Sequence, residues 1–185
     1  MWESKEMKTR QLSLLPKPKR EFGGDSTKGK RKTQRPFDPK RAIHLSLRAS
    51  SARGPKSMLK LEMKWKIHDI LSRIGEKRNI RVYRYANVGN HLHLLVQAKS
   101  RRDFQAFLRE FAGAVAVAVT GAAKGRPQKF WDSLAWSTVV EWGRQFKNVT
   151  RYILLNLMET SGLRNRELLA KLEREGILIL APNPP

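Results

Sequence analysis

Hydrophobic and polar residues alternate along most of the chain from residue 41 onward, and the period of this alternation changes between segments. Apolar side chains near every second position predict strands over residues 41–50, 79–88, 91–98 and 133–142. Spacing of three to four residues predicts helices over residues 57–76, 101–121, 144–160 and 164–176. The predicted order of elements is therefore β-α-β-β-α-β-α-α.

Residues at the ends of these segments support the assignment. Gly89, within Val-Gly-Asn, is placed to join two strands into a hairpin. Ser100 and Asp103 have the spacing of a capping box at the start of a helix that Gly121 would end. In the helix over 57–76, we expect one apolar stripe to face the core, formed by Met58, Leu61, Trp65, Ile70 and Ile74.

This order of elements is that of a ferredoxin-like split βαβ arrangement in the α+β class. It predicts an antiparallel four-stranded sheet with helices mainly on one face, followed by C-terminal helices. The fold alone does not select a function, because RNA-binding modules, nucleases and metabolic enzymes all use it.

The first 40 residues lack this pattern. They are rich in Pro, Gly, Ser and Lys without a sustained period, which predicts a disordered basic arm over residues 1–40. A catalytic body over 41–163 and a charged helix and tail over 164–185 would follow. The arm has twelve basic and five acidic residues, a net +7, which leaves +15 of the total +22 for the remainder. Both parts are therefore basic.

The net charge indicates a polyanionic partner, for which nucleic acid is the best interpretation. No apolar run approaches the roughly 20 residues that cross a bilayer, and the N-terminus lacks a secretory signal. The absence of cysteine excludes disulfides and thiolate metal sites and fits a reducing cytoplasm. We therefore expect a cytoplasmic protein that binds nucleic acid and no membrane. The small residues over 112–123 suggest close helix packing on the sheet or on the partner of a homodimer.

Two histidines lie one residue apart on the predicted third strand. Side chains alternate faces along a strand, so His91 and His93 point the same way and Leu92 points the other way. Two such imidazoles can bind one metal ion and leave positions open for a third ligand, water and substrate. His44 lies on the first strand, where we expect it to support this pair or to pack in the core.

The helix over 144–160 offers a nucleophile. Its apolar stripe, Phe146, Val149, Ile153 and Leu157, is expected to be buried, whereas Tyr152 lies on a polar stripe with Asn148 before it and Asn156 after it. Packing at the rim of the core is the alternative role for this tyrosine.

Several basic and aromatic side chains are candidates for contact with DNA. Arg144, Lys147 and Arg151 flank Tyr152 on its helix and suit backbone phosphates, as does Lys129 in the basic loop. Tyr83 and Tyr85 alternate with apolar residues on the second strand, where they could stack on bases or cover the sheet.

Residues 89–96 (GNHLHLLV), the basic loop ending in Phe-Trp-Asp and residues 151–163 (RYILLNLMETSGL) together resemble the single-tyrosine HUH transposases. These are small insertion-sequence transposases and their REP-associated relatives. The His-hydrophobic-His triplet is short, and it becomes specific through its place on the third strand, with a tyrosine-bearing helix some sixty residues later. The resemblance implies Mg²⁺ or Mn²⁺ at the histidines, cutting of single-stranded DNA next to a hairpin, and a tyrosine joined to the 5′ phosphate.

On this resemblance, His91 and His93 match the metal ligands, Tyr152 the nucleophile, and Asn156 the polar position that completes the metal site. This chain has Gly-Asn-His where relatives commonly have Pro-Asn-His, and Leu157 where Pro often follows in REP-associated members. A carboxamide is a weaker ligand than a carboxylate, so Glu141 and Glu159 stay alternatives for the third position.

Two other functions compete with a transposase that works through a phosphotyrosine. A non-catalytic nucleic-acid-binding protein of ferredoxin-like fold would need the charge and the aromatic residues but not the histidine pair with Tyr152. An enzyme that uses metal-activated water would need the histidines but not the tyrosine.

Overall fold

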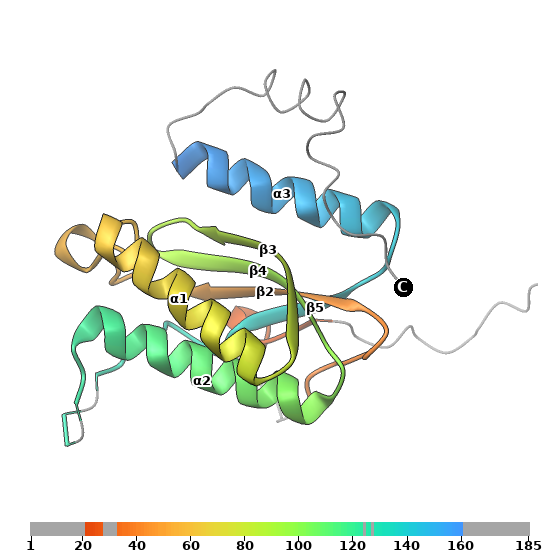
Figure 1. Cartoon of the computed structure of the whole chain (residues 1–185), viewed down its shortest axis with the longest axis horizontal. Helices are drawn as coiled ribbons and strands as arrows, with labels where there is room; N and C mark the ends of the chain where they lie inside the picture. The colour runs from red at the N-terminus through yellow and green to blue at the C-terminus, as the bar shows by residue number, and fades with distance from the viewer. Residues whose placement is uncertain (1–20, 28–32, 124, 127, 161–185) are drawn as a thin grey trace, which may run out of the picture.

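The computed structural model describes residues 21–27, 33–123, 125–126 and 128–160. The strands are β1 (Glu21–Phe22), β2 (Ala42–Arg48), β3 (Ile80–Asn87), β4 (His91–Ala98) and β5 (Trp136–Val140). The helices are α1 (Leu61–Lys77), α2 (Arg101–Thr120) and α3 (Arg144–Thr160), with short 3₁₀ turns η1 (Gly24–Thr27) and η2 (Gly54–Lys56) (Figure 1). The helix and tail predicted over 164–185 lie outside the described residues.

The strands form one antiparallel sheet in the order β1-β5-β2-β4-β3. Without β1, the order β5-β2-β4-β3 is that of the ferredoxin-like arrangement, so the predicted fold class is confirmed. The expected strand number was wrong, because β1 adds a fifth strand by pairing Glu21 with Thr138 and Phe22 with Ser137. A strand of two residues has no period that a sequence pattern could reveal.

Part of the predicted arm over residues 1–40 packs on the sheet. Besides β1, the guanidinium of Arg35 donates hydrogen bonds to the hydroxyl of Ser137 and, at 2.9 Å, to the carbonyl of Ala135. The rings of Phe37 and Phe104 lie 5.9 Å apart. The expectation of disorder is therefore wrong for these residues, while residues 1–20 lie outside the described part of the chain.

Helices cover both faces of the sheet. α1 and α2 lie together on one face, as predicted, whereas α3 crosses the opposite face (Figure 1). The larger core lies between the sheet and α1 and α2, and it includes Leu45, Leu92, Phe104 and Phe107. A smaller core that includes Leu95, Phe146 and Ile153 lies beneath α3. The polar side chains of the central strands are consequently enclosed on the α3 face.

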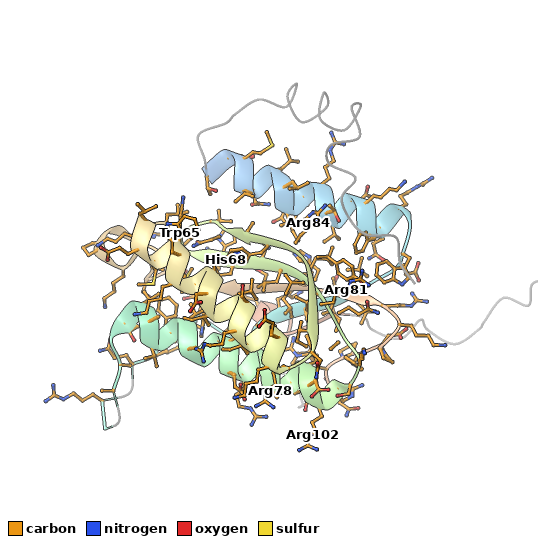
Figure 2. All side chains as sticks on the ribbon, in the orientation of Figure 1. Trp65, His68, Arg78, Arg81, Arg84 and Arg102 are labelled. Atoms are coloured by element: carbon orange, nitrogen blue, oxygen red, sulfur yellow. The ribbon has the colours of Figure 1, made fainter. Side chains whose placement is uncertain are left out.

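The buried stripe of α1 differs from the expected one. The helix begins at Leu61, and Leu61 and Trp65 are exposed, with Trp65 on the outer side of the helix in Figure 2. Ile70 and Ile74 are buried as expected, as is Met58 before the helix, and Ile67 and Leu71 complete the buried side in place of Leu61 and Trp65. α1 therefore packs through its second half.

Among the residues that the structure describes, no helix is long and apolar enough to span a membrane.

Candidate active site

The histidine pair lies on β4 at the centre of the sheet. In the register with β2, His91 is opposite Arg48 and His93 is opposite Ser46. Leu92 and Leu94, between and beside them, are in the larger core on the other face. The two imidazole rings lie 4.8 Å apart and nearly perpendicular. The predicted same-face arrangement of the histidines is therefore present.

The third histidine of the site comes from the neighbouring strand. His44 on β2 pairs with Leu95, so its side chain is on the same face as His93, diagonally across the two strands. Its ring lies 5.5 Å from that of His93 and 5.3 Å from that of Trp136 on β5. The sequence pattern alone gives no sign that Trp136 belongs to the site. The period-2 pattern predicts which residues share a face within β2 and within β5. Only the register between the two strands places the side chains of His44 and Trp136 together.

Tyr152 reaches the histidines from α3. Its ring lies 5.2 Å from the ring of His93 and 6.0 Å from that of His44. Phe146 and Ile153 anchor the helix to the sheet, as expected, whereas Leu157 is exposed and the polar Thr150 is buried. Tyr152 remains 46 % exposed while His93 is only 4 % exposed. The phenol is thus the accessible member of a cluster whose imidazoles are enclosed.

Burial keeps the histidines of this cluster in the neutral form. Desolvation, with smaller contributions from the charges of His44 and His91, lowers the pKa of His93 to about 3. Desolvation alone lowers the pKa of His44 to about 4. The pKa of His91 is lowered by burial and then by the charge of Arg48. Neutral imidazole is the form that ligates metal ions.

The hydrogen-bonding state of the imidazoles fits a divalent cation. Both ring nitrogens of His93 and the Nε2 atom of His44 are buried without a hydrogen-bond partner. The Nδ1 atom of His91 lies 2.7 Å from the side-chain oxygen of Asn90, which orients the ring and leaves Nε2 as the atom for a ligand. Buried polar atoms are rarely left unpaired, so these nitrogens fit the role of metal ligands.

The described residues do not supply a complete metal site of acidic and imidazole ligands. Among them, no three His, Asp or Glu side chains form a group that could hold an ion. The remaining ligands of a metal at His91 and His93 would be an amide oxygen, water or substrate oxygens. Oxygen ligands of this kind are the ones that Mg²⁺ and Mn²⁺ prefer.

The three candidates for a third ligand differ in their surroundings. The amide of Asn156, one turn after Tyr152, donates a 2.8 Å hydrogen bond to the carbonyl of Tyr152, which leaves its oxygen for other contacts. The carboxylate of Glu141 lies three residues beyond Thr138, the partner of His44, and forms a 2.9 Å ion pair with Arg41. Glu159 is exposed near the end of α3. Asn156 therefore stays the best candidate.

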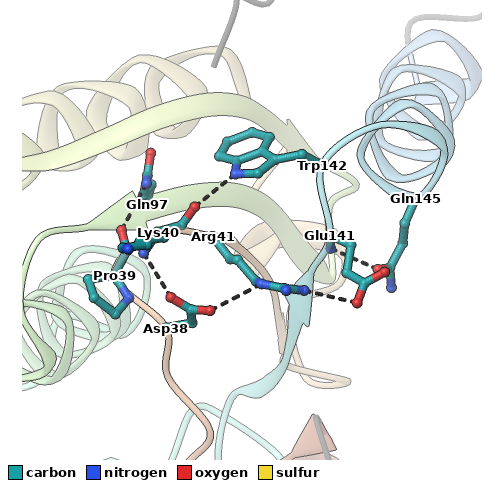
Figure 3. A network of polar contacts seen from close by, with 8 residues as sticks. All are labelled: Asp38, Pro39, Lys40, Arg41, Gln97, Glu141, Trp142 and Gln145. Carbon is teal, nitrogen blue, oxygen red and sulfur yellow. Dashed lines mark hydrogen bonds and ion pairs between the residues drawn. The ribbon is translucent and has the colours of Figure 1, made fainter. Parts of the chain in front are cut away.

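A polar network fixes the start of α3 and thereby the position of Tyr152. The Arg41 guanidinium binds both Asp38 and Glu141, and the backbone N–H of Glu141 donates to Gln145 at 2.8 Å (Figure 3). The indole of Trp142 donates to the carbonyl of Lys40 at 2.8 Å. The loop before α3 is thus tied to the segment before β2, the strand that carries His44.

The candidate phosphate contacts lie on accessible surface. Arg144, Lys147 and Arg151 are exposed on α3, as Lys129 is in the loop after α2. The spacing of Arg144, Lys147 and Arg151 puts them on one side of the helix, which adjoins the side that carries Tyr152. These positions suit a nucleic-acid strand that runs along α3.

The positions of Tyr83 and Tyr85 do not suit the base stacking expected of them. The register of β3 shifts between Val82 and Arg84, and a bulge of this kind reverses the alternation of faces. Tyr83, opposite in face to Val82, is packed beneath α3 against Trp142 and Phe146 and is only 6 % exposed. Tyr85 is half-buried against the larger core, on the other face. Neither ring is displayed as a stacking platform.

Replacing Tyr83 with Leu should affect stability rather than DNA binding. The change removes a 2.6 Å hydrogen bond to Gln97 and part of the packing under α3. We expect the free energy of unfolding to fall by about 1–3 kcal/mol in urea titrations. Affinity for a labelled oligonucleotide, measured where the variant is folded, should not change. A clear loss of affinity would restore a stacking role for Tyr83.

Comparison with known proteins gives matches to a family profile and to solved structures. The sequence profile described as "Transposase IS200 like" matches residues 47–154. No curated protein matches the sequence. The similar solved structures include the following two. The structure of a REP-associated tyrosine transposase bound to a REP hairpin has 14 % sequence identity and a TM-score of 0.56, over 72 % of this chain and 75 % of that one. A protein from Deinococcus radiodurans R1, described only provisionally as a transposase, has 17 % identity and a TM-score of 0.42, over 68 % and 98 % of the two chains.

Proposed function

The chain belongs to the family of IS200-like transposases, and we propose that it cleaves and rejoins single-stranded DNA through a covalent bond between Tyr152 and a 5′ phosphate. The observation that carries this proposal is the contact of an accessible phenol with a buried, neutral imidazole. Tyr152 is 46 % exposed and its ring lies 5.2 Å from His93. A tyrosine used only for packing would not need a place beside imidazoles whose nitrogens lack hydrogen-bond partners.

The proposed reaction exchanges one phosphate ester for another. The Oη atom of Tyr152 attacks the phosphorus of the scissile phosphodiester, and the bond from phosphorus to O3′ breaks. The electron pair of that bond goes to O3′, which takes a proton and leaves as a 3′-hydroxyl, while the phenol releases its proton to solvent. Because the phosphotyrosine retains an ester bond, a 3′-hydroxyl can attack it in the reverse step and rejoin the DNA.

A divalent ion fits the same residues. The Nε2 atom of His91 and a ring nitrogen of His93 would hold Mg²⁺ or Mn²⁺, with the side chain of Asn156 as the third protein group. Such an ion polarises a phosphate oxygen and stabilises the charge that develops on it. His44 would pack against His93 and Tyr152 and limit the motion of both rings.

The charge of the chain supports DNA as the substrate. The net charge of +22 attracts a polyanion, and Arg144, Lys147 and Arg151 would bind backbone phosphates beside Tyr152. The similar REP-associated transposase is bound to a REP hairpin. We therefore propose a single-stranded DNA that carries a hairpin near the cleaved bond.

Substitutions should distinguish the candidates for the third metal group. Glu141→Gln should leave Mn²⁺ affinity unchanged, because this carboxylate is engaged with Arg41. Asn156→Ala should weaken Mn²⁺ binding roughly tenfold to a hundredfold. Isothermal titration with Mn²⁺ would measure both. A loss of affinity in Glu141→Gln that exceeds the loss in Asn156→Ala would contradict the assignment.

Incubation with an end-labelled hairpin oligonucleotide and Mn²⁺ tests the function as a whole. We expect a labelled band at the mass of a protein–DNA adduct on a denaturing gel, and none in the presence of EDTA. Cleavage without an adduct would indicate metal-activated water instead. Tight binding with neither cleavage nor adduct would favour the non-catalytic nucleic-acid-binding protein.

A further inference from the structure

A cavity lies on the face of the sheet opposite Tyr152. Its volume is about 390 Å³, and it opens between α2 and the segment that leads into β5. Its lining comes from α2, from residues within 131–135, from Leu47 on β2 and from Arg35. None of these side chains takes part in the chemistry described above.

The lining combines an apolar floor with a cationic rim. Leu47, Leu108 and Trp131 supply apolar surface, and the indole N–H of Trp131 is fixed by a 2.9 Å hydrogen bond to the carbonyl of Ala112. Arg35 and Arg109 supply two positive charges, and no acidic side chain lines the cavity. Flat apolar surface beside guanidinium groups is the chemistry that binds a nucleotide.

The two guanidinium groups differ in how they are held. Arg35 is fixed by its hydrogen bonds to Ser137 and Ala135, and it lies 4.5 Å from the centre of the Phe22 ring. Burial lowers the pKa of Arg35 to about 10, so it stays charged at neutral pH. Arg109 is exposed on α2. Neither arginine forms an ion pair with a carboxylate of the described residues, which leaves both charges for a ligand.

The cavity and the histidine cluster share one end of the sheet. Ala135, in the cavity wall, directly precedes Trp136, whose ring lies 5.3 Å from His44. Leu47, in the cavity floor, directly precedes Arg48, the partner of His91. A single-stranded DNA that leaves the histidine face can therefore turn around this end of the sheet, past the exposed Arg48, and reach the cavity within a few nucleotides.

We propose that this cavity binds one nucleotide of the single-stranded DNA that flanks the cleaved bond. The base enters against Leu108 and Trp131, its edge meets Gln105 and Ser133, and its phosphate lies between Arg35 and Arg109. The site holds the flanking strand while the hairpin occupies other surface. This inference rests on the proposed function only in taking single-stranded DNA as the substrate.

Fluorescence anisotropy with two labelled hairpins tests the proposal, without divalent metal so that no cleavage intervenes. One hairpin carries single-stranded extensions and the other has blunt ends. Arg109→Ala should weaken binding of the extended hairpin about tenfold and of the blunt hairpin less than about twofold. Arg102→Ala is the matched control, because Arg102 is exposed on the same helix outside the cavity (Figure 2). It should change both affinities equally and slightly.

Photocrosslinking locates the nucleotide independently. Bromodeoxyuridine placed in the extension should crosslink to residues 131–135, as identified by mass spectrometry. Equal effects of Arg109→Ala on the two hairpins, or crosslinks confined to other segments, would overturn the proposal. Because these measurements do not use the cleavage reaction, they stand if no tyrosine adduct forms. Adduct formation by the unaltered chain, together with identical behaviour of Arg109→Ala and Arg102→Ala, would remove the cavity site alone.

Discussion

Tyr152→Phe should abolish strand cleavage and adduct formation while the fold and DNA affinity persist. Phenylalanine keeps the ring that lies 5.2 Å from His93 and removes only the hydroxyl that would attack phosphorus. Tyr152 is 46 % exposed, so loss of its hydroxyl should cost less than about 1 kcal/mol of stability. Denaturing gels would measure the adduct, and anisotropy with the uncut hairpin would measure affinity.

Tyr83→Phe is the matched control for this variant. It also removes one phenolic hydroxyl, but that hydroxyl bonds Gln97 at 2.6 Å beneath α3. The control should lose about 1 kcal/mol of stability and keep its cleavage activity. If Tyr152→Phe still cuts DNA at the rate of the unaltered chain, then water or another hydroxyl is the nucleophile and the phosphotyrosine mechanism is wrong.

Much of the fold could be predicted because local signals and global packing agree. The hairpin turn needs Gly89, because its φ is +92° and a Cβ atom at this position would lie 2.9 Å from the side chain of Leu59. Ser100 accepts a hydrogen bond from the N–H of Asp103, and Gly121 ends α2 in the left-handed conformation. Each of these features depends on a few adjacent residues, which a single sequence displays.

The features that could not be predicted depend on contacts between distant segments. β1 exists because Glu21 and Phe22 find an open edge of β5. The bulge between Val82 and Arg84 changes which face the ring of Tyr85 occupies without altering the residue pattern. Trp65 sits at helical spacing from apolar neighbours, yet α1 turns it outward, because the sheet is covered by the second half of that helix.

The candidate site likewise combines features that the local sequence pattern predicts with features that depend on contacts between distant segments. Strand alternation alone places His91 and His93 on one face, and helix periodicity separates Tyr152 from the buried stripe. That His44 and Trp136 join them follows from the register of β2 with β4 and β5, which pairs Ser46 with both His93 and Trp136. The cavity beside α2 likewise draws its residues from four separate segments of the sequence, so no motif marks it.

His93→Leu should stabilise the metal-free protein and eliminate its response to metal. Leucine has a similar volume and removes two buried ring nitrogens that have no hydrogen-bond partner. Because such atoms cost free energy when they are unpaired, we expect the free energy of unfolding to rise by about 1 kcal/mol without metal. A saturating ligand at a hundredfold its Kd stabilises a folded protein by about 2.7 kcal/mol. This stabilisation by Mn²⁺, together with cleavage, should be lost in His93→Leu and in His91→Ala.

His68→Leu is the matched control for the metal prediction. His68 is exposed on α1, on the other face of the sheet (Figure 2), so its replacement should leave Mn²⁺ stabilisation and cleavage unchanged. Thermal unfolding with and without Mn²⁺ would compare the variants. If His93→Leu unfolds, the histidine supports the fold rather than a metal. If it folds and Mn²⁺ still stabilises it, the ion binds elsewhere. A protein that is more stable without His93 but inactive would show that these unpaired nitrogens are retained for the reaction, at the expense of the fold.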